Sequence, residues 1–230
     1  MHIGLKFFSW AFSLPIMMLV FYFPVSTIAS DVGVVEFSAD LVHQIPTQEA
    51  VVGKLYVTKD KIRREEGSGE KSRITIEDFS ANKAFVLNPA RKEYVEIPRP
   101  SAQSDRSRSS AKRPLPGDAD HLCANHAQFR CKLLSKNERI ADRLVEKWEI
   151  VREMQIKEQG TQTMRALVWV DRKLGANVRE ERFINGDAVG SSGFRAIREA
   201  PQDKSLFKVP MDYRRIEMPR QSFGTPPNNN

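Results

Sequence analysis

The sequence predicts a mainly β protein whose strands pair in antiparallel order. Apolar and polar residues alternate with a period of two, most clearly in Arg73–Phe79 (RITIEDF), and this is typical of a strand with one buried face. Turn signals separate such runs at short intervals, so strands adjacent in sequence should pair as hairpins. No amphipathic helical pattern extends beyond about three turns. The sequence therefore favours a curved antiparallel sheet with few short helices.

The first half of the chain should form about six strands of a meander between Val34 and Ile97. Its β-rich runs are Lys54–Val57, Arg73–Phe79, Ala84–Leu87 and Tyr94–Ile97. The turn signals between them are Thr58–Asp60, Gly67–Gly69, Ser80–Asn82 and Asn88–Ala90, all rich in residues that favour turns.

A polar, basic stretch interrupts this pattern. Pro100–Ser110 contains no large apolar residue, and the stretch ends in Pro114–Gly117. Such a composition predicts a flexible basic loop, a disordered insertion at about 99–117. A solvated insertion is the favoured interpretation, and a tether for an anionic partner is the other.

A second β-rich half follows the insertion. Strands are predicted for Arg130–Ser135, Leu144–Val151, Met164–Val170, Asn177–Ile184 and Phe194–Glu199. Asn185-Gly186-Asp187 predicts a hairpin turn. Pro201–Pro210 should be a turn or a short helical piece anchored by Leu206 and Phe207, Tyr213–Met218 should add an edge strand, and residues 219–230 should be a disordered tail.

The N-terminus has the order of a secretory signal peptide. A short basic start precedes the apolar run Phe7–Val25, and small residues follow at Ser26–Ser30. We expect residues 1–30 to be a signal peptide cleaved after Ala29 or Ser30, and residues 31–218 to form one periplasmic domain. The alternative is a membrane anchor, because the apolar run is nearly long enough to span a bilayer.

The amino-acid composition limits which classes of protein and partner are compatible with the sequence. The hydrophobic fraction is 40% and the charged fraction 28%, which suits one globular domain with a core. The net charge is +7, but the signs are interleaved, as in Arg179–Arg182 (REER). A nucleic-acid partner is not expected, since its footprint would be a stripe of one sign.

The two cysteines, Cys123 and Cys131, should form a disulfide in an oxidising compartment. His121 and His126 lie beside them, and such ligands could hold zinc or copper. Because the spacing matches no known metal site, we expect neither a metal nor another cofactor.

No catalytic signature is recognisable, and we do not expect an enzyme. Gly190–Gly193 (GSSG) lacks the spacing of a nucleophile elbow and is expected between strands. Five aromatic residues within predicted strands are the candidate lining of a hydrophobic-ligand cavity: Phe85, Tyr94, Trp148, Trp169 and Phe194. For any one of them taken alone, a place in the core of the sheet is the better explanation. A curved sheet with no helix to fill its concave face would leave an apolar concavity.

Several short motifs resemble the LolA/LolB-like periplasmic proteins, of outer-membrane lipoprotein-sorting type. They are Gly53–Glu65, Ile74–Asp78, Phe85–Pro89, Lys147–Ile150, Val168–Asp171, Gly175–Arg179 and Ser205–Pro210. The resemblance covers nearly the whole exported chain. It implies an open β half-barrel whose concave face holds acyl chains under a cover of helices or loops, and the Arg/Ser-rich insertion is a candidate for this cover.

The function predicted from these observations is a periplasmic carrier or binding protein for lipid or lipoprotein acyl chains. The alternative is an envelope protein-interaction module with a filled core, which binds a partner strand at an exposed sheet edge. The two differ in whether the concavity is open.

Overall fold

A computed structural model describes residues 35–98, 114–156 and 160–217. The chain divides into two compact units, residues 1–31 and 32–230, and only the second contains described residues. The predicted signal peptide, most of the predicted insertion and the predicted tail lie outside the described residues. Among those described, no helix is long and apolar enough to cross a bilayer.

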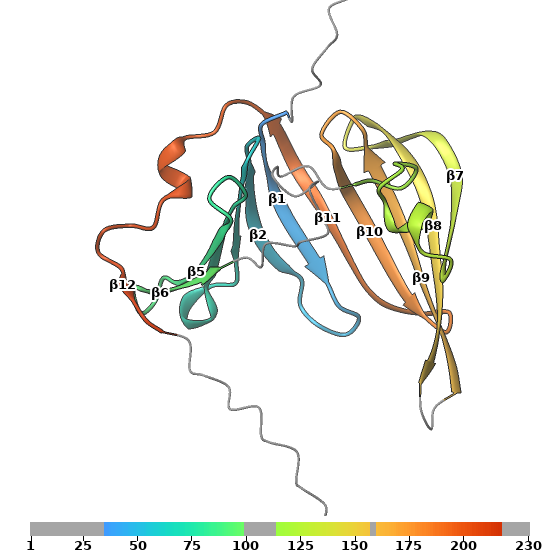
Figure 1. Ribbon diagram of the computed structural model, residues 1–230, viewed down its shortest axis with the longest axis horizontal. Coiled ribbons are helices and arrows are strands. Elements are labelled where there is room, and N and C mark those ends of the chain that lie inside the picture. Colours follow the sequence, from blue (N-terminus) through green and yellow to red (C-terminus); the bar gives the residue numbers. More distant parts are fainter. Residues whose placement is uncertain (1–34, 99–113, 157–159, 218–230) are drawn as a thin grey trace, which may run out of the picture. The chain divides into compact units, whose positions relative to one another are not determined.

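The described part of the chain forms one sheet of twelve strands (Figure 1). The first-half strands are β1 (Phe37–Gln44), β2 (Val51–Val57), β3 (Lys61–Glu66), β4 (Arg73–Asp78), β5 (Lys83–Asn88) and β6 (Glu93–Pro98). The second-half strands are β7 (Phe129–Ile140), β8 (Arg143–Ile156), β9 (Gly160–Asp171), β10 (Ala176–Ile184), β11 (Asp187–Glu199) and β12 (Arg214–Arg215). The short helices are η1 (Gly69–Lys71), α1 (Leu122–Asn125) and η2 (Lys204–Phe207).

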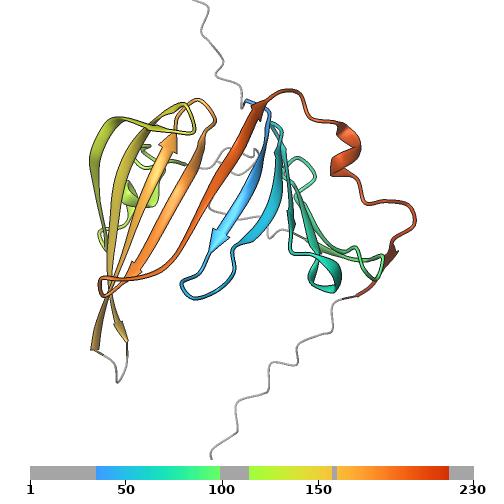
Figure 2. The same ribbon diagram turned by 180° about the vertical axis from the view of Figure 1, so that it is seen from behind.

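The strand order is β12-β6-β5-β4-β3-β2-β1-β11-β10-β9-β8-β7. β1–β6 and β7–β11 each form an antiparallel meander, and β1 joins the two by pairing antiparallel with β11. β12 adds to the edge of β6 in parallel orientation. The end strands β12 and β7 do not pair, so the sheet stays open, as both views show (Figures 1 and 2). This confirms the predicted mainly β, open antiparallel class with few short helices.

The strands of the second half are longer than the alternation predicted. β8 spans 14 residues and β11 spans 13. Bulges let them continue where the alternation fails, for example between Leu133 and Ser135 of β7. The prediction that Gly190–Gly193 lies between strands is wrong, because these residues lie inside β11. Their small side chains do not prevent pairing with β10 on one side and β1 on the other.

Apolar side chains gather on both faces of the sheet. The main cluster joins β1–β3 to β8–β10 and contains Phe37, Leu55, Val57, Ile62, Val145, Leu167, Trp169, Leu174 and Val178. A second cluster lies under η2, where Phe207 packs on Ile76 and Leu87. Arg63 fixes η2 by donating a hydrogen bond to the carbonyl of Leu206 at 2.8 Å. The predicted helical piece anchored by Leu206 and Phe207 is therefore present.

One residue of β11 has a strained backbone. Ala196 has a φ of +48°, at the bulge where β1 and β11 change register. An L-residue in this left-handed region costs about 1–2 kcal/mol, and only glycine adopts it freely.

Ala196→Gly should therefore raise the free energy of unfolding by about 0.5–1 kcal/mol, since relief of strain exceeds the entropy that glycine adds to the unfolded chain. Ala188→Gly is the matched control on the same strand, at a position without positive φ, and should lower stability. Urea unfolding of both variants measures the difference. Equal losses in the two would show that the bulge is not strained.

Candidate hydrophobic-ligand site

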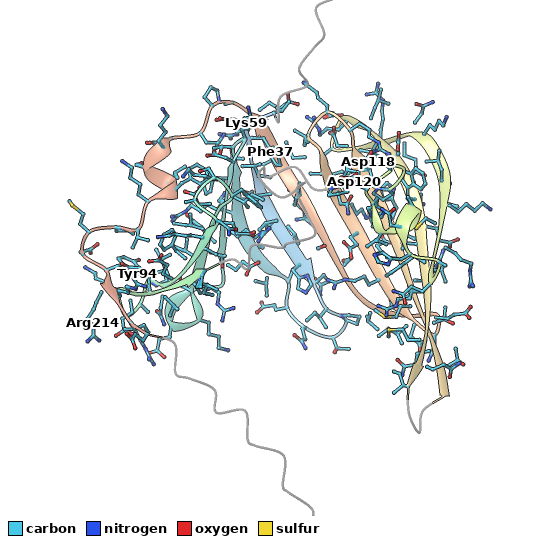
Figure 3. All side chains as sticks on the ribbon, in the orientation of Figure 1. Phe37, Lys59, Tyr94, Asp118, Asp120 and Arg214 are labelled. Carbon is cyan, nitrogen blue, oxygen red and sulfur yellow. A yellow bond between two sulfur atoms is a disulfide. The ribbon has the colours of Figure 1, made fainter. Side chains whose placement is uncertain are left out.

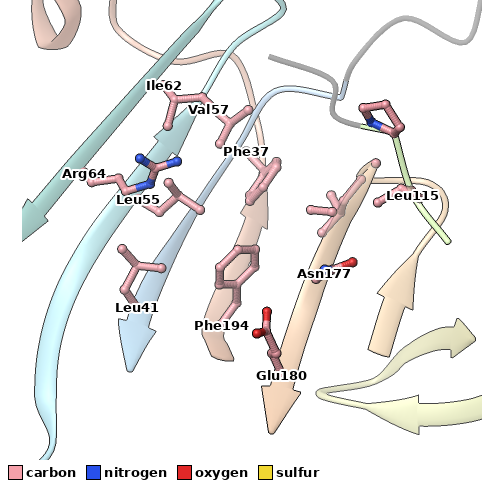
Figure 4. Close-up of a pocket in the computed structure, with 14 residues that line it drawn as sticks. Phe37, Leu41, Leu55, Val57, Ile62, Arg64, Leu115, Asn177, Glu180 and Phe194 are labelled. Carbon is pink, nitrogen blue, oxygen red and sulfur yellow. The ribbon is translucent and has the colours of Figure 1, made fainter. Parts of the chain in front are cut away.

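An apolar hollow of about 300 Å³ lies on one face of β1, β2, β3, β10 and β11 (Figure 4). Its lining residues are Phe37, Leu41, Leu55, Val57, Ile62, Arg64, Pro114, Leu115, Leu174, Gly175, Ala176, Asn177, Glu180 and Phe194. The volume is at the lower end of the range for small-molecule sites, which are typically apolar with a few polar groups.

Strand pairing explains why these side chains converge. Residues directly opposite one another on paired strands share a face, and the register pairs Phe37 with Val57 and Leu41 with Phe194. Leu41 is also opposite Gly53, where a Cβ would lie 2.2 Å from the backbone oxygen of Glu65. The strands approach too closely there for any side chain, so the hollow beside Leu41 stays unfilled.

Three polar side chains mark the border of the hollow. Arg64 is neutralised by Glu77, with 2.6 Å between guanidinium nitrogen and carboxylate oxygen. Glu180 lies across the hollow, 3.4 Å from Arg182 (Figure 4). The Oδ1 atom of Asn177 is buried and accepts no hydrogen bond within the described structure. The hollow thus has an apolar floor bordered on opposite sides by two ion pairs, Arg64–Glu77 and Arg182–Glu180.

A cover segment, Pro114–Asn125, closes one end of this face. Leu115 packs on Val168 and Val170 of β9, and it also lines the hollow. The chain leaves β6 at one end of the sheet and is next described where this segment packs near the other end. Residues 114–117 of the predicted flexible loop are therefore ordered and cover apolar surface.

Arg172 fastens the cover segment to the sheet. Its guanidinium donates hydrogen bonds to the carbonyl of Pro116, to Asp118 at 2.9 Å and to Glu146 at 2.8 Å. Trp148 donates to the same Glu146 carboxylate at 2.9 Å. The three partners come from the cover segment and β8, so Arg172 joins elements distant in sequence.

The five aromatic residues chosen from the sequence are not brought together. Phe194 lines the hollow, whereas Trp169 lies in the main cluster, 5% exposed. Trp148 packs beneath the cover segment, and Phe85 and Tyr94 pack under η2. Figure 3 shows Tyr94 beside Arg214 at one end of the sheet, with Asp118 of the cover segment near the other.

Half of the lining residues are aliphatic, and none of these was among the candidate lining residues predicted from the sequence. Leu41, Leu55, Val57 and Ile62 lie on one face of β1–β3. The alternation of apolar and polar residues in these strands indicated which side chains share a face. Only the pairing register of the strands shows which face contains the hollow.

The predicted disulfide is present. Cys123 of α1 bonds Cys131 of β7, with 5.8 Å between their Cα atoms. It ties the cover segment to the edge strand across a sequence separation of 8. His121 serves as the N-cap of α1, its Nδ1 accepting from the Cys123 amide at 3.2 Å. The described residues contain no group of three side chains placed to hold a metal.

Acid should loosen the cover segment. The Arg172 guanidinium lowers the pKa of Glu146 from its ordinary 4.5. A carboxyl whose pKa is lowered by folding stabilises the protein above its unfolded pKa, and this contribution is lost as the pH falls below it. Wild type should therefore lose more stability than Glu146→Gln between neutral pH and about pH 3. Melting curves of both proteins at both pH values measure the loss of stability. An equal loss in wild type and Glu146→Gln would contradict this role of the Glu146 carboxylate.

The chain matches no protein-family model and no curated protein. Among solved structures, it is similar to an uncharacterised conserved protein from Thermus thermophilus, with a TM-score of 0.44, 11% identity and coverage of 81% of this chain and 93% of that one. It is also similar to a LolA superfamily protein from Nitrosomonas europaea, with a TM-score of 0.31, 9% identity and coverage of 76% and 90%. At these scores neither similarity bears on function, and the lipoprotein-sorting branch of the resemblance stays a prediction.

Proposed function

We propose that the protein binds the acyl chain of a lipid or lipoprotein in the apolar hollow and carries it within the bacterial envelope. The observation behind this proposal is the hollow itself: about 300 Å³ of space among side chains that would favour an apolar ligand over water. Each methylene that leaves water contributes about 0.8 kcal/mol. About ten methylenes would contribute about 8 kcal/mol, enough for micromolar binding before the entropy cost of association.

The proposed setting is the periplasm, and the proposed activity is binding without catalysis. The signal-like N-terminus supports export. The Cys123–Cys131 disulfide supports an oxidising compartment. Arg64 and Glu180 border the hollow on opposite sides, where they can contact the polar head of an amphiphile.

A second candidate function is the protein-interaction module. The observation that favours it is β7, a strand of 12 residues at the end of the sheet order. One side of β7 therefore has no paired strand within the described structure, and such an edge can accept a partner strand. The bulges in β7 oppose this, because they interrupt the regular row of backbone donors and acceptors.

Leu41→Trp tests the proposed acyl site. The larger side chain would occupy part of the hollow, so affinity for a fluorescent fatty acid should fall at least about tenfold, as measured by titration. Leu144→Trp is the matched control, because Leu144 is 60% exposed and does not line the hollow. No binding to the wild-type protein, or equal loss in both variants, would contradict an acyl site here.

A further inference from the structure

A second hollow, of about 290 Å³, lies on the opposite face of β1, β2 and β11. Side chains alternate between faces along a strand. Phe37, Leu41 and Leu55 line the apolar hollow, whereas their direct sequence neighbours Ser38, Asp40, Lys54 and Tyr56 line this one. Its lining residues are Ser38, Ala39, Asp40, Lys54, Tyr56, Ala196 and Arg198. This polar hollow is thus built on the reverse side of the strands that form the acyl site.

The strained bulge at Ala196 brings two arginines to the polar face. Arg195 and Arg198 are three residues apart, and in a regular strand their side chains would point to opposite faces. The register pairs Arg195 with Asp40 and Arg198 with Ser38. These partners are only two residues apart on β1, so both arginines share their face. Strained bulges recur at functional sites, where they re-aim side chains.

The charges around the polar hollow do not cancel. Asp40 forms an ion pair with Lys54, with 2.5 Å between carboxylate oxygen and ammonium nitrogen. Glu65 forms an ion pair with Arg63 at 2.7 Å. Neither Arg195 nor Arg198 has an ion-pair partner among residues 35–98, 114–156 and 160–217. Arg195 and Arg198 therefore remain without ion-pair partners, with Arg198 at the hollow itself. The nearby Glu36 carboxylate accepts a hydrogen bond from the Gln202 amide at 2.8 Å, so the two arginines exceed it by one positive charge.

Neutral donors complete this arrangement. The hydroxyl groups of Ser38 and Tyr56 line the hollow and have no hydrogen-bond partner among the described residues. Ser38 pairs with Arg198 on one side and with Tyr56 on the other, so the three form one row across β11, β1 and β2. A guanidinium fork with adjacent hydroxyl groups matches the several acceptor oxygens of a tetrahedral oxyanion.

We propose that this polar hollow is a phosphate-binding site, with Arg198, Ser38 and Tyr56 as direct donors and with Arg195 supplying a further positive charge. The phosphate is either a free ion or the headgroup of a membrane lipid, since both present the same oxygens. The proposal stands on the reverse face of the sheet and does not depend on acyl binding.

An NMR titration of the purified protein with inorganic phosphate, at ionic strength balanced with chloride, tests the free ion. We expect saturable shifts of the Ser38 and Tyr56 amide signals. Arg198→Gln should weaken binding about tenfold to a hundredfold, as loss of a hydrogen bond between charged groups does. Arg198→Lys should fall in between. Arg73→Gln removes the same charge from an exposed position on β4, outside the hollow, and should change nothing.

Sedimentation with phosphatidylcholine vesicles, with and without phosphatidic acid, tests the lipid source. Binding that needs phosphatidic acid, is lost in Arg198→Gln and is kept in Arg73→Gln and Leu41→Trp would support a headgroup site even if free phosphate does not bind. The proposal is overturned if neither probe binds, or if Arg73→Gln weakens binding as much as Arg198→Gln, because the effect would then be one of net charge.

Discussion

Arg143→Met should lower the free energy of unfolding by about 3–5 kcal/mol, the usual cost of removing one partner from a buried ion pair. Asp171 is 2% exposed, and its carboxylate is paired with the Arg143 guanidinium. The same guanidinium reaches Glu199 at 2.7 Å. Without it, Asp171 would keep a buried charge whose remaining side-chain bond is from the Leu174 amide at 3.0 Å. Urea unfolding measures the loss.

Lys173→Met is the matched control for this prediction. Lys173 pairs with the same Glu199 at 2.5 Å, but its side chain is 66% exposed. Exposed pairs contribute about 0–1 kcal/mol, so this variant should remain near wild type. Asp171→Asn combined with Arg143→Met should recover part of the loss, since the uncompensated charge is gone. A loss below about 1 kcal/mol for Arg143→Met would show that water reaches Asp171.

Trp169→Ala should cost about 3–5 kcal/mol of stability, as truncation of a buried aromatic residue does. The indole is 5% exposed. Its N–H donates to Glu138 at 2.6 Å, and Lys147 and Arg179 lie over its ring at 4.8 and 5.0 Å. These contacts make Trp169 a core residue linking β7–β10, and the loss should appear as a lower melting temperature.

Trp169→Phe separates packing from hydrogen bonding in this cluster. It keeps an aromatic ring but removes the N–H, so it should cost about 1–3 kcal/mol, less than the alanine variant. Fatty-acid affinity of the folded Trp169→Ala protein should match wild type, because Trp169 does not line the hollow. Unchanged stability with lost binding would contradict the structural role and favour the ligand-lining role predicted from the sequence.

The fold could be predicted where local signals agree with tertiary structure. Arg73–Glu77 alternates without interruption, and β4 occupies Arg73–Asp78. Asn185 and Gly186 take φ values of +51° and +94°, the backbone that an Asn-Gly hairpin turn requires. The Cys123–Cys131 disulfide could be predicted without the fold, because the two cysteines are close in sequence and the expected compartment is oxidising.

The site was harder to predict because it depends on register. Trp169 and Val168 are neighbours in sequence, yet one lies in the main cluster and the other beneath the cover segment. Aromatic type could not distinguish these environments. The bulge at Ala196 likewise shifts which side chains of β11 share a face, and nothing in Phe194–Glu199 signals an extra residue. Arg172 and Asp118 meet across 54 positions, a pairing invisible to local patterns.

Native mass spectrometry of the protein purified from the periplasm tests the acyl-binding proposal most directly. We expect an additional mass matching a lipid or a fatty acid on the wild-type protein and on Leu144→Trp, and its loss from folded Leu41→Trp. A wild-type protein that carries no such mass and gains none when incubated with fatty acids would contradict it, and would favour the interaction module with a filled core.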